Sequence, residues 1–252
     1  MGLTTYVALG DSMSIDRYPD LDHAERQRLE RPRTGLGAAS LLARNDDHVW
    51  PQFAGRDLVT RSPAIECGFH ATDGATTESV LDAQVDALRS IDPGGAALVT
   101  LTAGGNDLLG LIGATDRAGR AGVRTVLDNL DAILGIVRDR LPRATILVAN
   151  VYDPTDGTGD LEGARLQPQE MRWLGDYNAV VERLCRRRGA RLIDVHGHFA
   201  GHGRSAPAEK RWYWTGSLIE PGVIGASEIR RLWLAAVEES RPGSRTRRPA
   251  DR

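Results

Sequence analysis

The sequence predicts a three-layer α/β/α sandwich around a mainly parallel, five-stranded sheet. Five short runs rich in apolar and β-branched residues recur along the 252 residues, and most are separated by segments with helical periodicity. Three of the runs are close to continuously apolar, as expected for strands that are covered on both faces. Strands that alternate with helices favour right-handed crossovers and therefore one parallel sheet.

The individual elements can be placed along the chain. The predicted strands lie near residues 4–9, 64–67, 97–102, 145–150 and 191–195. Apolar stripes at i, i+3 and i+4 spacing predict helices over residues 126–141, 174–184 and 229–237. Gly189 is a suitable end for the second of these helices, and a shorter helix is expected to begin near Glu78. Arg230 and Arg231 fall on the polar side of the last helix, so both are expected to be solvated.

Residues 1–240 are predicted to form one domain, because no internal repeat or linker divides them. Residues 16–33 are densely charged and contain prolines; they form either a flap over the end of the first strand or a solvated surface excursion. Residues 153–160 hold several carboxylates and glycines, but their spacing differs from that of a calcium loop, and a turn is expected. Residues 241–252 mix Arg, Pro, Gly and Ser and are predicted to be a disordered tail.

Composition narrows the classes of function. The net charge is −2, so no overall field favours nucleic acid as a partner, and no glycine-rich phosphate loop is present. Cys67 and Cys185 show neither a disulfide framework nor metal-ligand spacing, so both are expected to be buried, reduced thiols. The chain has no export signal and no apolar run long enough to span a bilayer, which makes a cytoplasmic location the expectation. The oligomeric state is not visible in the sequence.

A glycine, an acid and a serine end the first predicted strand, as Gly10-Asp11-Ser12. In α/β proteins, reactive groups gather where parallel strands run out into loops at the carboxyl edge of the sheet. Because Gly10 allows a sharp turn there, Ser12 is a candidate nucleophile. A serine after a strand is also an ordinary helix cap, so this block alone is a weak signal.

Two further blocks strengthen the interpretation. Gly104-Gly105-Asn106-Asp107 follows the third strand, where the Asn106 amide can donate a hydrogen bond without carrying charge; the plainer alternative is a turn that caps the next helix. Gly74 lies between the second strand and a helix start. A glycine lets the backbone approach a ligand closely, and N–H groups near a helix start bind negative charge.

Taken together, these blocks resemble those of the SGNH, or GDSL-type, esterase/lipase family, and the resemblance runs from residue 4 to about residue 237. It implies a flavodoxin-like fold and a serine hydrolase that cleaves a small-molecule carboxylic ester through an acyl-enzyme. It assigns the nucleophile to Ser12. The oxyanion-hole donors would be the backbone N–H groups of Ser12 and Gly74 and the side-chain amide of Asn106. No cofactor is implied.

The last block departs from the family. The family's Asp-x-x-His-Pro is expected before the final helix, but residues 217–221 read Ser-Leu-Ile-Glu-Pro, so that Glu220 stands in place of the histidine and Ser217 in place of the aspartate. Three alternatives follow, in order of preference. In the first, His202, in a glycine-flanked loop after the fifth strand, activates Ser12 while Glu220 orients its imidazole. In the second, Glu220 is itself the base, with a pKa raised by burial. In the third, the base is lost, and the protein only binds an acyl or glycan ligand. Acyl transfer to an alcohol would use the same site as hydrolysis.

Overall fold

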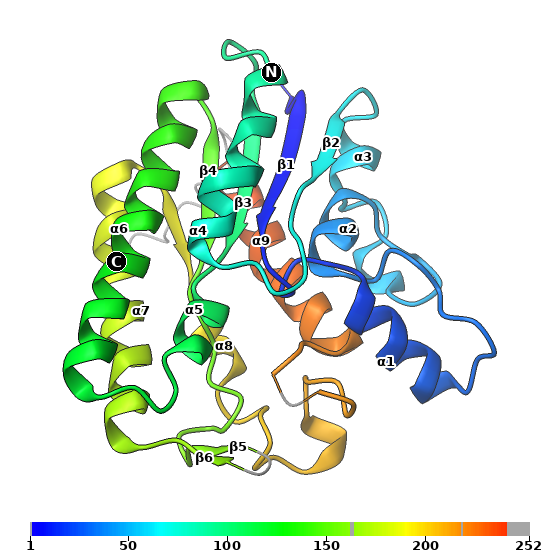
Figure 1. The fold of residues 1–252 in the computed structure, drawn as a ribbon. Coiled ribbons are helices and arrows are strands. Elements are labelled where there is room, and N and C mark those ends of the chain that lie inside the picture. The colour runs from blue at the N-terminus through cyan, green and yellow to red at the C-terminus, as the bar shows by residue number, and fades with distance from the viewer. Residues whose placement is uncertain (1, 162–163, 218, 241–252) are drawn as a thin grey trace, which may run out of the picture.

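A five-stranded parallel sheet lies at the centre of the computed structural model, which describes residues 2–161, 164–217 and 219–240 (Figure 1). Its strands are β1 (Thr5–Gly10), β2 (Glu66–Phe69), β3 (Ala97–Thr102), β4 (Thr145–Ala149) and β7 (Arg191–Ile193). Their order is β2-β1-β3-β4-β7, and every pairing is parallel. The five predicted strands are confirmed. β7 ends before residue 195 because the Asp194 side chain caps a short helix there.

Helices cover both faces of the sheet, which gives the predicted three layers (Figure 1). One face is covered by α4 (Thr77–Ser79), η2 (Val80–Gln84), η3 (Val85–Ser90), α6 (Asp116–Arg140) and α7 (Pro168–Arg188). The other carries α2 (Ala38–Ala43), α3 (Leu58–Arg61), α8 (Val195–Phe199) and α9 (Val223–Glu239). Alternate residues of the central strands contribute to the two cores, since successive side chains point to opposite faces. Val7 and Leu9 lie in the first core, whereas Tyr6 and Ala8 lie in the second.

The predicted helices are confirmed, with boundaries that local chemistry explains. α6 begins at a Thr115 cap that accepts from the Ala118 N–H. α7 begins at a proline and ends at Gly189, which has the left-handed φ of 64° that glycine adopts without strain. The chain is completed by η1 (Pro51–Phe53), α5 (Gly105–Gly110), the strand pair β5 (Asp160–Leu161) and β6 (Ala164–Arg165), and η4 (Ala208–Lys210).

Residues 16–33 contain a helix, α1 (Arg17–Gln27), that is fastened to the rest of the domain. The Asp22 carboxylate accepts a hydrogen bond from the Val223 N–H at the start of α9, at 2.9 Å. Glu25 accepts one from the Trp214 indole at 2.7 Å. The segment is therefore docked against α9 and the chain that precedes it, and is more than a solvated excursion.

The expectation for Arg230 was wrong, because its side chain is fully buried. Its guanidinium lies 3.5 Å from the centre of the Phe53 ring and donates to Asn45 Oδ1 and to Ser227 Oγ, both at 2.7 Å. The planar, weakly hydrated guanidinium can be stacked and hydrogen-bonded at the same time, which makes its burial tolerable. Arg231 is exposed, as predicted.

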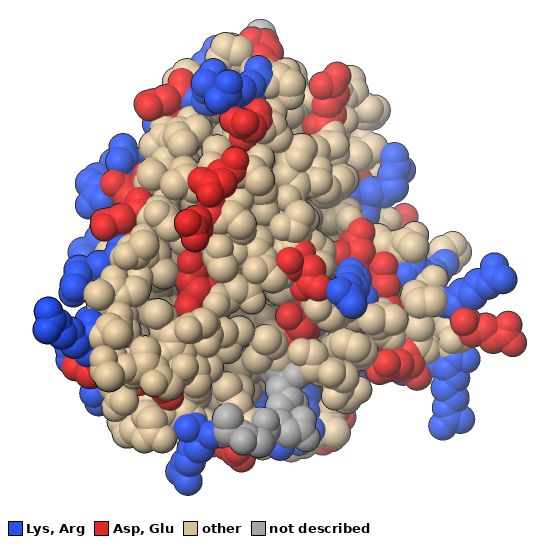
Figure 2. Space-filling view, viewed as in Figure 1, with Lys and Arg blue, Asp and Glu red and all other residues tan. Residues whose placement is uncertain are grey.

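The surface carries both signs of charge. Figure 2 shows basic side chains along the edge formed by α6 and α7, with acidic side chains between them and the centre of this face. Within the described ranges, no helix is long and apolar enough to cross a membrane. Nor do three or more His, Cys, Asp or Glu side chains of these residues come together as a metal site. The predicted disordered tail, 241–252, lies outside the described residues.

Candidate active site

Ser12 lies in a turn that only glycine can introduce. Gly10 has φ of 125°, and a Cβ atom at this position would come 1.9 Å from the backbone oxygen of Thr102. The Gln84 side chain holds both backbone groups of Gly10: its Oε1 accepts from the Gly10 N–H at 2.7 Å, and its Nε2 donates to the Gly10 oxygen at 2.9 Å. Thr102 Oγ1 accepts from the Asp11 N–H at 3.1 Å. The turn that presents Ser12 is thus fixed from two neighbouring segments.

We expect Gly10→Ala to lower the free energy of unfolding by at least about 2 kcal/mol, since it adds both backbone strain and a collision. Urea denaturation measures the loss. Gly55→Ala is the matched control, because Gly55 also has a positive φ, 73°, but its Cβ would meet nothing within 4 Å. Equal losses in the two variants would show that the collision with Thr102 contributes nothing.

The blocks that contain Gly74 and Asn106 are joined by hydrogen bonds. Asn106 Nδ2 donates to the Ala75 oxygen at 2.9 Å. The Asp107 carboxylate accepts from the Thr77 N–H at 2.9 Å and from its hydroxyl at 2.7 Å. Gly74 is exposed, with φ of 70°, one residue before Ala75. The structure therefore brings the predicted second and third blocks side by side.

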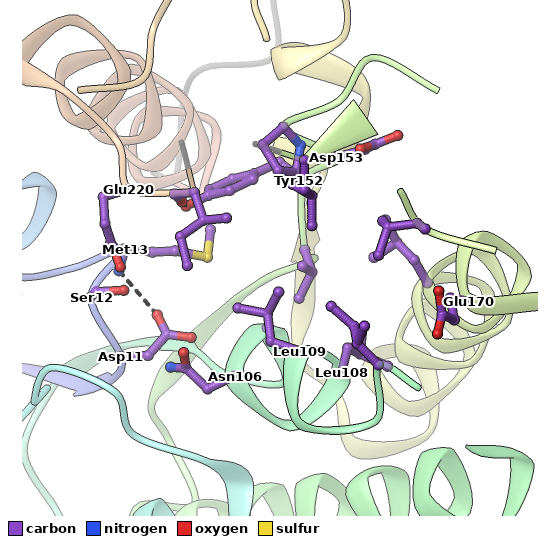
Figure 3. A pocket seen from close by; sticks show the side chains of 18 of the residues that line it. Asp11, Ser12, Met13, Asn106, Leu108, Leu109, Tyr152, Asp153, Glu170 and Glu220 are labelled. Atoms are coloured by element: carbon purple, nitrogen blue, oxygen red, sulfur yellow. Dashed lines mark hydrogen bonds between the residues drawn. The ribbon is translucent and has the colours of Figure 1, made fainter. Parts of the chain in front are cut away.

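Ser12, Asn106 and Glu220 line one pocket, which holds about 100 Å³ of space for water-sized molecules (Figure 3). Gly74 is not among the residues that line it. The rest of the wall is largely apolar and comes from α5, α7, the chain after β4 and the β5–β6 region. Figure 3 shows the side chains of Ser12 and Glu220 pointing toward one another at one end of this pocket.

The loop between η4 and α9 delivers Glu220. The backbone oxygen of Glu220 accepts a hydrogen bond from the Trp214 N–H at 2.9 Å, and Tyr213 forms an isolated antiparallel bridge with Pro221. The Tyr152 hydroxyl donates to the Ile219 oxygen at 2.5 Å. These bonds hold the segment against the end of β4, so that the Glu220 side chain reaches the serine.

Burial makes the carboxyl group of Glu220 less acidic. Only 7% of the residue is exposed, and burial raises its pKa to about 7; the Ser12 hydroxyl, which donates toward the carboxylate, opposes part of that rise, while negative charge on Asp11 adds to it. Its Oε2 atom is buried and finds no hydrogen-bond partner among the described residues. Glu220 therefore accepts a hydrogen bond from Ser12, keeps a second carboxyl oxygen without a partner among the described residues, and has a pKa near neutrality.

Asp11 is a second buried acid next to Ser12. Burial raises its pKa to about 6, although the Thr102 hydroxyl and the Met13 N–H stabilise the carboxylate. The Met13 N–H donates to Asp11 Oδ1 at 3.1 Å, the bond drawn in Figure 3. Two acidic groups therefore flank the serine, one on each side of it.

His202 does not line this pocket. Its ring stacks on Trp212, with centroids 3.6 Å apart and planes 8° from parallel. Its Nδ1 lies 2.8 Å from the Lys210 oxygen. These contacts hold His202 within its own loop, so the structure does not bring it to Ser12 as the preferred arrangement required. The expected partnership of His202 with Glu220 is not formed.

Comparison with known proteins decides the family. A model described as the GDSL-like lipase/acylhydrolase family matches residues 8–212, about four-fifths of the sequence. The chain belongs to this family. The match includes the three blocks with Ser12, Gly74 and Asn106 but ends before Glu220, the residue that departs from the expected family pattern. A search of curated proteins finds no match to this GDSL-family chain.

Solved structures share the fold of this GDSL-family member at low identity. An extracellular lipase from Streptomyces rimosus is 22% identical, with a TM-score of 0.61 over 94% of this chain and 100% of the lipase. A phospholipase A1 from Streptomyces albidoflavus is 22% identical, with a TM-score of 0.56 over 94% and 99%. An acetyl xylan esterase is 14% identical, with a TM-score of 0.59 over 92% and 99%. The likeness confirms the α/β/α fold of the family.

Several residues that shape the GDSL-family site were missed from the sequence. Gln84 and Thr102 hold the turn before Ser12, and Tyr152 holds the Glu220 loop. A buried glutamine in an otherwise apolar helix stripe is a signal that could have identified Gln84, since buried amides need partners. The leucines at positions 108 and 109, directly after Asn106-Asp107, were a comparable signal of an apolar wall beside the block that contains Asn106.

Proposed function

We propose that this protein is a serine hydrolase that cleaves carboxylic esters, with Ser12 as nucleophile and Glu220 as general base. The observation that carries the proposal is the buried Glu220 carboxyl group, which faces the Ser12 hydroxyl and accepts a hydrogen bond from it. A base acts best when its pKa lies near the working pH, and an ordinary carboxylate is too weak for this task. Burial gives Glu220 a pKa of about 7, which meets that requirement.

Three donors support stabilisation of the oxyanion. Asn106 Nδ2 carries two hydrogens, and the Ala75 oxygen accepts one of them, which leaves the other for a ligand. The backbone N–H groups of Ser12 and Gly74 make no hydrogen bond within the part of the chain that the structure describes. Each donor aimed at a developing oxyanion typically contributes about 2.7–4 kcal/mol. Gly74 is exposed and does not line the pocket, so its N–H contributes only where the bound ester extends beyond that lining.

The proposed reaction has two steps. Ser12 Oγ attacks the ester carbonyl while its proton passes to Glu220, and the resulting oxyanion is held by the three donors. When the intermediate collapses, the C–O bond to the alcohol breaks, and Glu220 returns the proton to the departing alcohol. Water then attacks the acyl-enzyme, gives a proton to Glu220, and releases the acid as that proton returns to Ser12 Oγ. No cofactor enters this scheme.

Labelling with a fluorophosphonate tests the proposal directly, because this reagent reacts with an activated serine. We expect one label per chain, found on the peptide that contains Ser12 by mass spectrometry. The reaction should become faster as the pH rises through 7, since Glu220 must be ionised to accept the proton. A folded protein that takes up no label would support the alternative of a binding protein for an acyl or glycan ligand.

A further inference from the structure

The pocket beside Ser12 continues into a largely apolar space. Its walls include half-buried side chains from two helices, Leu108 and Leu109 on α5 and Met171 and Leu174 on α7. Ile112, just after α5, is 40% exposed although it is large and apolar. Apolar surface left open inside a concave site gains free energy when an apolar group covers it. The site is therefore suited to hold a hydrocarbon chain.

The polar part of the wall carries one sign of charge. Every titratable side chain that lines the pocket is acidic except Tyr152: Asp11, Asp153, Glu170 and Glu220. Lysine, arginine and histidine are missing from this lining, as far as the described residues define it. An anionic group on a ligand would therefore meet like charges and find no cationic partner.

Two of these acids are built into the wall. The Asp153 carboxylate accepts from the Thr155 and Gly157 N–H groups, both at 2.8 Å. Glu170 accepts from the Gly113 N–H at 2.7 Å and from the Gln167 N–H at 2.6 Å, which ties the chain after α5 to the start of α7. These carboxylates are held by backbone donors, so they cannot swing away to admit a negative charge.

We propose that this pocket receives the acyl group of the ester, and that the enzyme selects uncharged, apolar acyl chains of several carbons over both acetyl and dicarboxylic half-ester groups. The inference rests on the proposed function. Leu109 is the residue that controls chain length, because it lies three positions after Asn106 on α5 and therefore on the same face as the oxyanion donor. The part of a longer acyl chain that extends away from the carbonyl carbon must therefore pass Leu109.

The test is a series of 4-nitrophenyl esters from acetate to octanoate, with kcat/KM as the readout. Each added methylene that enters the pocket is expected to raise kcat/KM by about fourfold. Leu109→Trp should fill the pocket and so lower the ratio of kcat/KM for octanoate to kcat/KM for acetate at least about tenfold. Leu29→Trp is the matched control, since Leu29 is 42% exposed and lies outside the pocket, and it should leave the ratio unchanged.

The charge preference is tested at equal chain length. The 4-nitrophenyl ester of hexanoic acid is expected to be cleaved at least about a hundredfold faster than the half-ester of adipic acid, which ends in a carboxylate. Equal rates for these two esters would contradict the charge argument. The comparison needs no variant, so it holds whatever a substitution does to folding.

The remaining outcomes separate this inference from the proposed function. A normal Ser12-dependent acetate rate, with an octanoate-to-acetate ratio that Leu109→Trp does not change, would overturn the acyl pocket and leave the esterase intact. If Leu109→Trp does not fold, Met171→Trp fills the same pocket from α7 and must lower the ratio in the same way. Failure to cleave any ester, acetate included, would contradict the proposed function and this inference with it.

Discussion

Ser12→Ala is expected to lower ester turnover by about four orders of magnitude or more, because removal of an attacking oxygen leaves only binding and oxyanion stabilisation. The position is 7% exposed, and loss of one hydroxyl leaves the turn fixed by Gln84 and Thr102 intact. The variant should therefore still fold, with an unfolding midpoint lowered only by the loss of the hydrogen bond that the Ser12 hydroxyl donates to Glu220. Turnover of a short aryl ester, measured beside a urea denaturation curve, separates loss of chemistry from loss of structure.

The control for this experiment is Ser90→Ala. Ser90 is exposed at the end of η3, and its hydroxyl donates to the Ala87 oxygen of its own turn. The Ser90→Ala variant should be labelled by the fluorophosphonate and should hydrolyse the ester at the same rate as the unmodified protein. Ester turnover that persists in Ser12→Ala at the level of Ser90→Ala would remove Ser12 as the nucleophile.

The three central strands, β1, β3 and β4, could be predicted because they are covered on both faces. All six residues of β3 are buried, so its sequence is an apolar run that no surface strand would show. Gly10 and Gly104 were informative for a related reason. Both have positive φ, and at Gly104 a Cβ would come 2.2 Å from the Tyr177 hydroxyl, so each position admits little else. Where packing or backbone geometry leaves one choice, the residue type reveals the structure.

The Glu220 loop could not be predicted in the same way. Its placement depends on the bridge between Tyr213 and Pro221, which closes the loop on itself, and on the Tyr152 hydroxyl, which bonds to Ile219, 67 positions further along the chain. Neither contact follows a periodic pattern. The flanking glycines of His202 suggested mobility, but stacking on Trp212 outweighs that freedom. The Arg230 error has a similar origin, because its aromatic partner Phe53 is remote in the sequence. In each case a tertiary contact decided the outcome.

A buried acid beside a nucleophile carries a cost in stability. In the folded protein the pKa of Glu220 is about 7, above its ordinary value of 4.5. Between these two values the unfolded chain has released the proton while the folded chain still holds it. Stability therefore falls as the pH rises through this window, and the full loss is present above pH 7. The ionised form that destabilises the fold is the form that catalysis needs.

Glu220→Gln is therefore expected to have opposite effects on activity and stability. Turnover should fall about 10²- to 10⁴-fold, as for loss of a general base. The rise in kcat/KM with pH toward 7 should disappear, because the amide cannot ionise. At pH 8 the variant should be more stable than the unmodified protein by on the order of 2 kcal/mol, and near pH 4 by almost nothing. Rates and urea midpoints at the two pH values measure both effects.

Two companion variants identify the base. Glu220→His replaces the acid with the residue that the family pattern has at this position, and an imidazole of ordinary pKa, about 6.5, can also accept the serine proton. It should recover part of the activity that Glu220→Gln loses. His202→Ala should keep the rate within about threefold, because its ring is held by Trp212 and the Lys210 oxygen, away from the pocket. If the rate falls strongly in His202→Ala and is unchanged in Glu220→Gln, then His202 is the general base. The buried Glu220 carboxyl group would in that case have no role in the proton transfer.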